Sequence, residues 1–559
     1  MTTAANTTDP VAGGSIFAPL RHGVFPRVWF ASLGTSFGGL IQGVGAAWAM
    51  TQLSGRADLV ALVQTASFTP ILLLSLVAGA IADMYDRRIV GLVALSITIS
   101  GAIALTAFAY LKLLSPHTIL LCCFTAGCGG ALFGPAWQAS VREQVPVELL
   151  PQAISLNSIS YNVARSFGPT IGGALVATAG VAATFVTNVL LYLPMFAVML
   201  TWRRQKEIPR LPPEGLGRAM VSGVRYLIHS PAIRIVVFRT LLLGIIGGAS
   251  SALMPLVARN LMHGTALTYG VLLGAFGIGA VGGALNMSAI RARFSGDQIV
   301  TVCMLVLGLG AIVVSVSRSL PLSVVALAMN GACWMLSVAS YNIEVQLAVP
   351  RWVAGRVLAV FQAAVAGGIA IGGVLWGNVA KSEGVAAALF ASGVAMLASP
   401  LLGLWLKMPR AQLAAEEARE VLAEPEVALA INSRSGPIVI EIDYRVDPAK
   451  AREFYQACLD IQLARQRNGA YDWSISRDIA DPELWTERFH CPTWLDYLRQ
   501  RSRLTQAERD LQQVVRDFHL GPEPVRIRRL LDRPFGSVRW KEETPDLAQD
   551  TPLLTPGTM

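Results

Sequence analysis

The stretch LLLSLVAGAIADMYDRRIVGLVALS, residues 72–96, places a short charged segment between two long apolar runs. Residues 79–88, at its centre, contain two Asp and two Arg, whereas the runs on either side are almost free of charge. An α-helix needs about 20 apolar residues to cross the roughly 30 Å hydrocarbon core of a bilayer. The stretch therefore predicts two membrane-spanning helices joined by a charged turn.

The composition of the whole chain is that of a membrane protein. Its mean hydropathy is +0.52, and charged residues make up 14% of the 559 positions, against roughly 25% in a soluble chain. The long apolar runs all lie before Lys407, and the rest reads as soluble. We expect twelve spans, which begin near Val28, Leu59, Ile89, Thr118, Gln152, Ala182, Ile233, Leu267, Ile299, Leu322, Val353 and Val385.

Basic residues alternate from one connection between spans to the next. One set of connections is rich in Arg, as at Arg87 and Arg88, and the other set holds single residues such as Arg56, Lys112 and Lys381. The positive-inside rule makes the rich set cytoplasmic, and with it both termini. The first residues, MTTAANTTDP, lack the basic start and apolar core of a signal peptide. In a membrane protein the net charge of +9 is no sign of nucleic-acid binding.

The membrane part divides into two halves. Its longest connection, residues 203–230, is basic and Pro-containing, and it separates six spans from six. GPTIGG at 168–173 is echoed by GGIAIGG at 367–373, although coincidental glycines would give the same echo. Repeats of this kind suggest two halves around a shared binding cavity. We expect an all-α membrane protein with a segment 1–27 and two six-helix bundles, residues 28–202 and 231–407.

A soluble region follows the spans. Residues 408–435 form a charged, Ala-rich linker, and residues 541–559 read as a disordered tail. Residues 436–540 read as strand 437–446, helix 448–466, strands 470–479 and 484–491, one long helix 492–518 and strand 524–531. Strand, helix, two strands, helix, strand is the order of a small α+β ferredoxin-like domain.

The charged turn predicts a gate at one face of the membrane part. Asp83 ends the second span, where the negative end of the helix dipole disfavours a carboxylate, so we expect the N-terminus of another helix to accept it. Arg87 and Arg88 would pair with Glu143 at the end of the fourth span, and Gly79 would let helices approach closely. The alternative is a positive-inside anchor whose acidic residues have no role.

This turn resembles the signature of the major facilitator superfamily, Gly-x-x-x-Asp-(Arg/Lys)-x-Gly-(Arg/Lys)-(Arg/Lys). Gly79, Asp83, Arg87 and Arg88 match it, whereas Met84 and Asp86 depart from it. ALFGPAWQAS at 131–140 and LNSISYNVARSFGPTIGG at 156–173 resemble the branch that contains bacterial enterobactin exporters and transmembrane secretion effectors.

The resemblance implies a transporter of the bacterial inner (plasma) membrane in which two bundles rock about a central site. It also places Asp83 near Gly355 and Arg356, at the start of the eleventh span. GPTIGG is similar to the fifth-span motif of antiporters, although small residues alone mean only helix packing. The matching residues are Gly168, Pro169, Gly172 and Gly173, while Ala164 and Ser155 replace upstream glycines. Cys123 stands where proton-linked antiporters often carry Arg, so proton antiport rests on the resemblance alone.

Arg165 is the most informative single residue. If the fifth span starts near Gln152, a rise of 1.5 Å per residue places Arg165 roughly 20 Å into the membrane, too deep for easy snorkelling. No Asp or Glu of the predicted spans reaches that depth. An anionic group of a substrate would therefore pair with Arg165. The alternative is a structural Arg bonded to backbone carbonyls at a helix bend.

Polar and aromatic side chains in the spans would complete a cavity around Arg165. Each of them has an alternative role as an interhelical packing residue. Arg239 lies nearer one membrane face and would snorkel. The predicted substrate pathway consists of Arg165 with Gln42, Gln64, Trp137, Gln138, Asn157, Asn162, Asn330, Trp334 and Gln362.

The soluble region resembles the antibiotic-biosynthesis-monooxygenase-like domain, in RQRNGAYDWSISRD at 465–478 and WTERFHCPTWLDYLRQRSRLT at 485–505. The resemblance implies pairing of two copies into a barrel. Some members are cofactor-free oxygenases, so a membrane-anchored oxygenase is the rival function. Its substrate would lie among Trp473, Trp485, Trp494 and His490, unless these residues are ordinary core.

The sequence therefore predicts a secondary active transporter that exports small amphipathic molecules, siderophore-like or drug-like, with proton antiport as its coupling. An importer is a further alternative. We expect no enzyme activity, cofactor or metal, because the seven Cys lack metal spacing and no phosphate-cradling loop occurs. The expected partners are the lipid bilayer, a small-molecule substrate, a coupling proton and a second copy bound through the C-terminal domain, but no nucleic acid.

Overall fold

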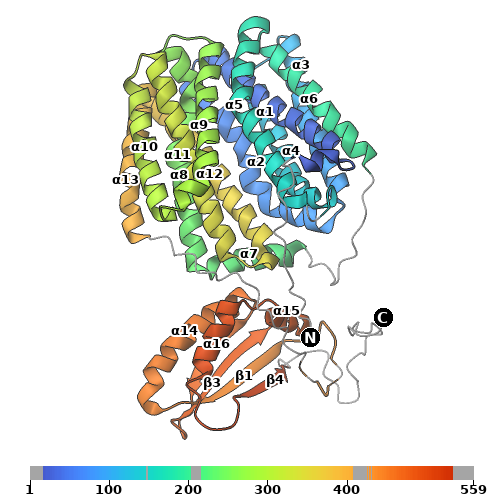
Figure 1. The fold of residues 1–559 in the computed structure, drawn as a ribbon, viewed down its shortest axis with the longest axis vertical. Helices are drawn as coiled ribbons and strands as arrows, with labels where there is room; N and C mark the ends of the chain where they lie inside the picture. Colours follow the sequence, from blue (N-terminus) through green and yellow to red (C-terminus); the bar gives the residue numbers. More distant parts are fainter. Residues whose placement is uncertain are drawn as a thin grey trace, which may run out of the picture. The chain divides into compact units, whose positions relative to one another are not determined.

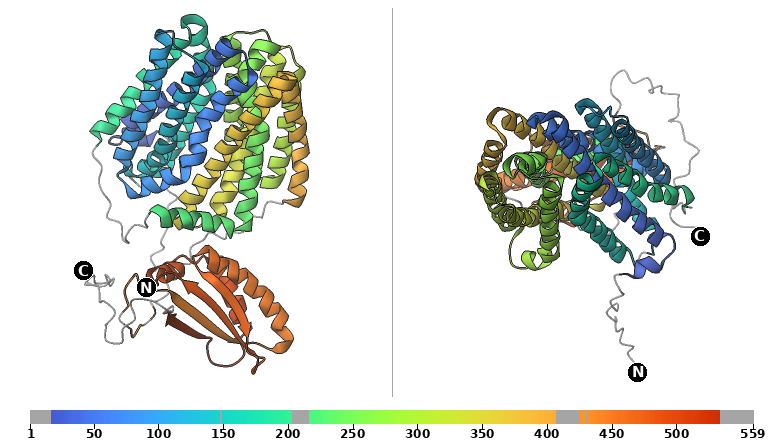
Figure 2. Two further views of the ribbon diagram at one scale, coloured as in Figure 1. Left: turned by 180° about the vertical axis from the view of Figure 1, so that it is seen from behind. Right: turned by 90° about the horizontal axis from the view of Figure 1, so that it is seen from above.

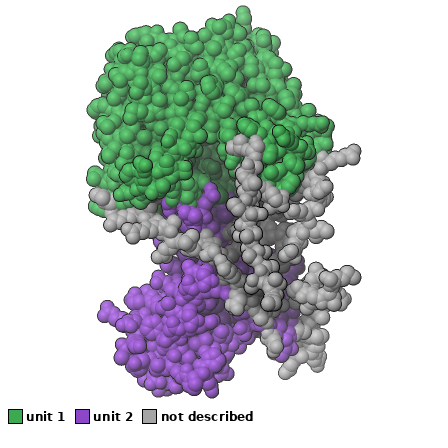
Figure 3. Space-filling view, viewed as in Figure 1, with its two compact units in different colours: residues 1–216, 235–343, 358–408 green, residues 217–234, 344–357, 409–559 purple. Residues whose placement is uncertain are grey.

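The computed structural model describes residues 17–146, 149–202, 216–406, 425, 427–429 and 431–532. These residues form two compact units, coloured separately in Figure 3. Unit 1 takes its residues from 1–216, 235–343 and 358–408, and unit 2 from 217–234, 344–357 and 409–559. Most of the predicted linker 408–435 and all of the tail 541–559 lie outside the described residues.

The first half of unit 1 consists of long apolar helices that end at turn-forming residues. α1 stops at Gly55, whose φ of +59° is left-handed, and α4 begins after a capping box of Ser115 and Thr118. Gly180, with a φ of +81°, separates α5 from α6. The helices are α1 (Phe25–Ser54), α2 (Ala57–Met84), α3 (Arg87–Tyr110), α4 (Pro116–Ser140), α5 (Leu150–Ala179) and α6 (Val181–Thr201).

The second half repeats this arrangement after the short helix α7 (Leu216–Ile228). Capping boxes at Thr265 and Ser295 begin α9 and α10. The two halves lie side by side in Figures 1 and 2. The long helices are α8 (Pro231–Leu256), which continues into the π-helical turn Val257–Leu261, α9 (Ala266–Arg291), α10 (Gly296–Val316), α11 (Leu320–Ala348), α12 (Arg351–Glu383) and α13 (Val385–Trp405).

Ten of the described helices are long and apolar enough to cross a membrane. The predicted number is twelve, and the two long helices not among the ten are α1 and α5. Both carry polar residues inside their length, such as Gln42 in α1 and Arg165 in α5. Polar residues lower the apolarity of a helix without shortening it, and they are tolerated where the helix faces protein or a water-filled cavity.

The largest buried core joins the two halves at one end of the bundle. It combines the last turns of α1 and the first turns of α2, such as Met50 and Val60, with residues of α8 and α9, such as Leu253 and Tyr269. This is the end at Asp58, which we call the opposite end. Smaller clusters towards the end at Arg87, which we call the basic end, each lie within one half. The two halves are therefore closed against each other at the opposite end.

The soluble domain of unit 2 is an antiparallel sheet with helices packed on it (Figure 1). Alternate residues of the first strand, Ile438, Ile440, Ile442 and Tyr444, are buried with Phe454 in its core. The strand order β2-β3-β1-β4 is the ferredoxin-like arrangement. The elements are β1 (Ile438–Arg445), α14 (Ala451–Arg467), β2 (Tyr471–Arg477), β3 (Leu484–Cys491), α15 (Trp494–Ser502), α16 (Gln506–Arg516) and β4 (Arg526–Leu531).

One predicted element of this domain was wrong. The single long helix expected at 492–518 is two helices, α15 and α16, separated at residues 503–505. The Thr505 side chain accepts a hydrogen bond from the backbone of Glu508, and the Glu508 carboxylate accepts one from the backbone of Thr505. This capping box starts a new helix, because it satisfies N–H groups that a continuous helix would bond internally.

Candidate functional site

Arg165 lies on α5 where this helix meets α9 of the other half. Its guanidinium carbon is 5.5 Å from the centroid of the Phe276 ring. The side chain is half-buried, and in the part of the chain that the structure describes it forms no ion pair or hydrogen bond. Arg165 is therefore a cation at the boundary between the halves, with an aromatic ring as its neighbour.

The helix-five motif sets how closely the two halves approach. A Cβ atom on Gly173 would lie 2.6 Å from the backbone oxygen of Ala266 and 2.9 Å from the Cα of Gly270, so α5 and α9 touch backbone to backbone. The Thr170 hydroxyl donates a hydrogen bond of 3.2 Å to the Gly270 oxygen. Of the other motif residues, Gly168 and Gly172 pack on α1 within their own half, and the Pro169 oxygen lies beside Gly270.

A second contact between the halves joins α2 to α12. The Thr65 hydroxyl donates to the Ala370 oxygen at 2.9 Å. At the opposite end the Asp58 carboxylate lies 3.2 Å from Lys381 Nζ and 2.7 Å from Arg56 Nη2. We call the Asp58–Lys381 pair the latch. Sequence reasoning missed it, because two single charges far apart in the chain carry no local signal of pairing.

Gln42 and Asn330, two residues of the predicted pathway, are buried and contact other helices of their own half. Gln42 is 6% exposed and accepts a hydrogen bond from the Asn188 amide, between α1 and α6 of the first half. Asn330 is 2% exposed and packs where Gly310 of α10 has no side chain. Both amides therefore contact a neighbouring helix of their own half, and their place in the pathway stays a prediction.

The remaining polar residues of the predicted pathway are dispersed. The Asn162 amide donates a hydrogen bond of 2.8 Å to the backbone oxygen of Ser158 on its own helix. The side-chain oxygen of Asn157 is buried and has no hydrogen-bond partner among the described residues. Gln64 is half-buried, and Gln138 and Gln362 are exposed. Asn157 therefore keeps a free acceptor on the helix of Arg165, whereas Asn162 is bonded within that helix.

The two tryptophans of the predicted pathway each pack within one half. The Trp137 ring is stacked on that of Phe133, with 5.9 Å between centroids. Trp334 of α11 fills the space beside Gly247 of α8, where a Cβ atom would lie 2.6 Å from the indole ring. Their contacts are those of packing residues.

The charged turn contacts the ends of two neighbouring helices. Asp86 caps α3 by accepting a hydrogen bond from the Arg88 backbone at 2.9 Å. Arg87 Nη1 lies 2.7 Å from a carboxylate oxygen of Glu143, so this predicted ion pair is present. Arg88 instead donates hydrogen bonds to the backbone oxygens of Met199 and Leu200, at the end of α6. Positive charge at a helix C-terminus is favourable, because carbonyl groups there are unpaired.

The other residues of the predicted gate are Gly79, Asp83, Gly355 and Arg356. The side chain of Asp83 lies outside what the structure describes. A Cβ atom on Gly79 would lie 4.0 Å from the Cβ of Ala359, so α2 and α12 are also in contact towards the basic end. Gly355 and Arg356 belong to unit 2, and their contact with Asp83 stays a prediction.

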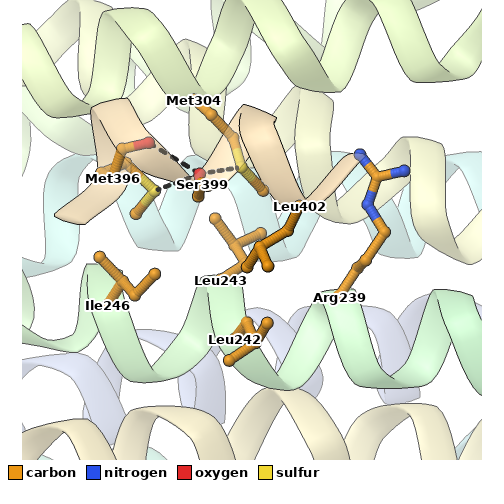
Figure 4. Close-up of a pocket in the computed structure, with 8 residues that line it drawn as sticks. All are labelled: Arg239, Leu242, Leu243, Ile246, Met304, Met396, Ser399 and Leu402. Atoms are coloured by element: carbon orange, nitrogen blue, oxygen red, sulfur yellow. Dashed lines mark hydrogen bonds between the residues drawn. The ribbon is translucent and has the colours of Figure 1, made fainter. Parts of the chain in front are cut away.

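Arg239 is buried and paired, contrary to the snorkelling predicted from its position. It is 4% exposed, and its Nη1 lies 2.6 Å from Asp297 of α10 and 3.2 Å from the Leu406 oxygen. Figure 4 shows it beside a small pocket between α8, α10 and α13. The pocket is lined otherwise by Leu242, Leu243, Ile246, Met304, Met396, Ser399 and Leu402, so apolar groups dominate it and its one charge is neutralised by Asp297.

Aromatic packing fills the interior of the soluble domain. The Phe454 ring lies 5.4 Å from that of Tyr444 and 5.6 Å from that of Trp485. Glu487, 1% exposed, accepts hydrogen bonds from Arg465 and Trp473. Two further residues named for the oxygenase alternative, Trp494 and His490, contact Tyr497 and Tyr471 respectively. The aromatic residues of that alternative therefore serve packing, and among the described residues no cluster of His, Cys, Asp and Glu could hold a metal ion.

Comparison with known families settles the classification. Residues 14–535, which include the soluble domain, match the family described as Transmembrane secretion effector. The chain belongs to this family. The family is a branch of the major facilitator superfamily, and the closed contact of two six-helix halves is the architecture expected of it.

Curated relatives of this family member are transporters. The multidrug efflux pump Tap of Mycolicibacterium fortuitum is 25% identical over 396 residues, which cover 69% of this chain and 96% of Tap. The enterobactin exporter EntS of Escherichia coli O1:K1 is 28% identical over 340 residues, covering 58% of this chain and 77% of EntS. Homologues and fold are those of transporters, not enzymes.

Solved structures agree on the fold. The nucleoside transporter NupG has a TM-score of 0.57 at 13% identity and covers 69% of this chain and 100% of that one. A bacterial homologue of the human lysosomal transporter Spinster, in an inward-facing and unoccupied conformation, has a TM-score of 0.53 at 14% identity, covering 68% of this chain and 94% of that one. Family membership and the curated relatives make the protein a multi-pass membrane transporter, whose setting is the lipid bilayer and whose cargo is a small molecule.

Proposed function

We propose that this protein exports small amphipathic molecules, siderophore-like or drug-like, across the bacterial inner membrane by alternating access. The observation that carries the proposal is membership of the Transmembrane secretion effector family over residues 14–535, together with Tap and EntS among the relatives. The names of these relatives describe efflux of drugs and export of enterobactin, a siderophore. Import is the alternative direction that the transport experiment below also tests.

The packing of the halves supports alternating access. Contacts at Gly173 and Gly270, and at Asp58 and Lys381, close the opposite end. A transporter that carries cargo across must break these contacts in another state, since both faces cannot be open at once. Close packing through small residues and one partly exposed ion pair suits a contact that forms and breaks in each cycle.

We propose twelve spans with both termini in the cytoplasm. Ten helices are apolar enough to cross, and α1 and α5 bring the number of spans to twelve. Each of these two is 30 residues long, which is more than enough to cross the bilayer. Orientation follows from the positive-inside rule, which makes the basic end cytoplasmic and the opposite end periplasmic.

The cytoplasmic gate is the second part of the proposal. The Arg87–Glu143 ion pair supports it, because it links the turn after α2 to the end of α4. Asp83 would complete the gate against the start of α12, near Gly355 and Arg356. Arg87 and Glu143 both belong to the first half, and their pair is formed while the opposite end is closed. In this proposal the contact that breaks when this end opens is therefore that of Asp83 with the start of α12.

A proton is the proposed coupling ion, and the resemblance to antiporters is its support.

Self-association is proposed through the open face of the soluble sheet. That face carries a ladder of ion pairs, with Glu441 3.1 Å and Asp443 3.3 Å from Arg528 Nη2. Charged groups of both signs on one face could pair equally well with those of a second copy.

Arg165 is proposed to bind an anionic group of the cargo. The test is transport into inverted membrane vesicles, with and without a pH gradient, of the anionic dye 8-anilinonaphthalene-1-sulfonate and the cationic dye ethidium. The Arg165→Ala variant should lower uptake of the anionic dye by roughly 10- to 150-fold, because a charged hydrogen bond contributes roughly 1.5–3 kcal/mol. Uptake of ethidium should not change. Arg165→Lys is the matched control and should keep part of the anionic uptake.

Two outcomes would contradict this proposal. Equal uptake of the anionic dye by wild type and Arg165→Ala would remove Arg165 from the pathway. Export of amphipathic molecules would be contradicted if wild-type vesicles took up both dyes no faster than vesicles lacking the protein, at every pH gradient. Loss of dye from preloaded inverted vesicles would indicate import.

A further inference from the structure

Unit 2 joins the soluble domain to two short segments of the membrane part. These segments are residues 217–234, which contain most of α7, and residues 344–357, which end α11 and begin α12 (Figure 3). They lie in one compact unit although residues 358–437 separate even the nearer segment from β1 in the sequence. The contacts inside this unit show what holds the three parts together.

Trp352, in the first turn of α12, is held from two directions. The Tyr226 ring of α7 meets it edge to face, with 5.8 Å between centroids and an angle of 88°. The guanidinium carbon of Arg503 lies 4.1 Å from the centroid of the indole ring. Arg503 directly follows α15 of the soluble domain. One tryptophan therefore joins α12, α7 and the soluble domain, by an aromatic contact and a cation–π contact.

α7 contacts the soluble domain at further points. Nη2 of Arg225 lies 3.0 Å from where a Cβ atom on Gly469 would be, so this glycine leaves room for the guanidinium. Tyr226 is 4% exposed, and burial raises the pKa of its hydroxyl. The charge of Arg467 lowers that pKa and the charge of Glu508 raises it.

α7 also lies directly on the beginning of α12. A Cβ atom on Gly223 would lie 2.8 Å from the Cβ of Arg356, closer than two such atoms can approach. The absence of a side chain at Gly223 thus permits this contact. α7 is consequently packed between the start of α12 and the soluble domain's own surface residues.

We propose that the soluble domain is a docked regulatory element whose binding partner is this chain itself, the surface formed by α7 and the first turns of α12. The residues that recognise each other are Trp352 with Tyr226 and Arg503, and Arg225 with Gly469. α12 runs without interruption from Arg351 to Glu383 and carries Ala370 and Lys381, which contact α2. Restraint at the start of this helix therefore acts on an element that joins the two halves. This regulatory role rests on the proposed transport function, whereas the docking does not.

Docking is tested on the full chain with a protease site inserted within residues 411–420. After the purified, folded protein is cut, size-exclusion chromatography at decreasing concentration measures how well the soluble domain stays bound. Wild type should retain it. Trp352→Ala and Arg503→Ala should each weaken retention about tenfold, because each removes the cation–π contact. Trp352→Phe should keep part of it, and Arg452→Ala, an exposed position on α14, should behave as wild type.

The two parts of the proposal fail separately. The docking would be overturned if the cut wild-type protein released the domain at all concentrations. It would also be overturned if wild type and both alanine variants retained the domain equally. The uncut variants are then compared in the vesicle assay with both dyes. A changed uptake rate in Trp352→Ala and Arg503→Ala, with Arg452→Ala unchanged, supports regulation. Weakened retention with unchanged uptake would overturn regulation and leave the docking in place. If wild type transports neither dye, the proposed function fails, whereas the retention result still decides the docking.

Discussion

Substitution of Gly173 by Ala tests the closed contact between the halves most directly. The added Cβ atom would lie 2.6 Å from the Ala266 oxygen and 2.9 Å from the Gly270 Cα. Favourable separations for such atoms are about 3.5–4.0 Å. α5 and α9 must therefore move apart by roughly 1 Å at this point, or the opposite end must open.

The size of the effect follows from the cost of overpacking, typically about 1–3 kcal/mol. Ala also favours a helix over Gly by about 1 kcal/mol. That gain is present in every state in which α5 stays helical, so it cancels from the equilibrium between the closed and open opposite end. A cost of about 1–3 kcal/mol on the closed state alone shifts this equilibrium by roughly 5- to 150-fold.

The assay is labelling of a single cysteine buried at the opposite end. Ala380 is 5% exposed in the shared core, and Ala380→Cys in a variant lacking the seven native cysteines supplies the probe. A membrane-impermeant maleimide added to intact cells should label it roughly 5- to 150-fold faster when Gly173→Ala is present. Gly130→Ala is the matched control, because a Cβ atom there meets nothing within 4 Å.

One result would refute the reasoning. If Gly173→Ala folds and is inserted normally, yet labels Ala380→Cys at the rate of the Gly130→Ala control, the two halves do not depend on close backbone contact at this position. Faster labelling in both variants would point to a general loosening of the bundle instead.

Two further predictions concern single side chains. Lys381→Ala removes one partner of the latch with Asp58. Because the Lys381 side chain is 52% exposed, the loss is about 0.2–1 kcal/mol and should speed labelling of Ala380→Cys by no more than about fivefold. A larger effect would mean that the latch dominates closure. In the soluble domain, burial raises the pKa of Cys458 from 9.0 to about 12, so near pH 8 its reactive thiolate is roughly a thousandfold rarer than in the unfolded chain. Iodoacetamide should label folded Cys458 correspondingly slowly, and equal rates in folded and unfolded protein would contradict this burial.

Helix and strand positions followed from the sequence because their signals are local. A run of apolar residues interrupted by Gly or Pro marks the ends of a span wherever its neighbours lie, and alternation marked β1 and β3 in the same way. The break between α15 and α16 had a local signal too, since Thr505 and Glu508 have the spacing of a capping box. The depth of Arg165 also came from counting residues along one helix.

The partners of those residues were decided only by the tertiary structure. Gln42 and Asn330 have the chemistry of pathway residues, but only the structure shows that they are buried against Asn188 and Gly310. Arg239 finds Asp297 on another helix.

The physical reason is the range of the interactions. The sequence by itself determined which segments are helices or strands and which end of each span is basic, because chain connectivity and hydropathy act between neighbours. Which helices meet, how Trp352 comes to lie between Tyr226 and Arg503, and why Asp58 faces Lys381 depend on packing between segments far apart in the chain. Only the folded arrangement brings those side chains within contact distance.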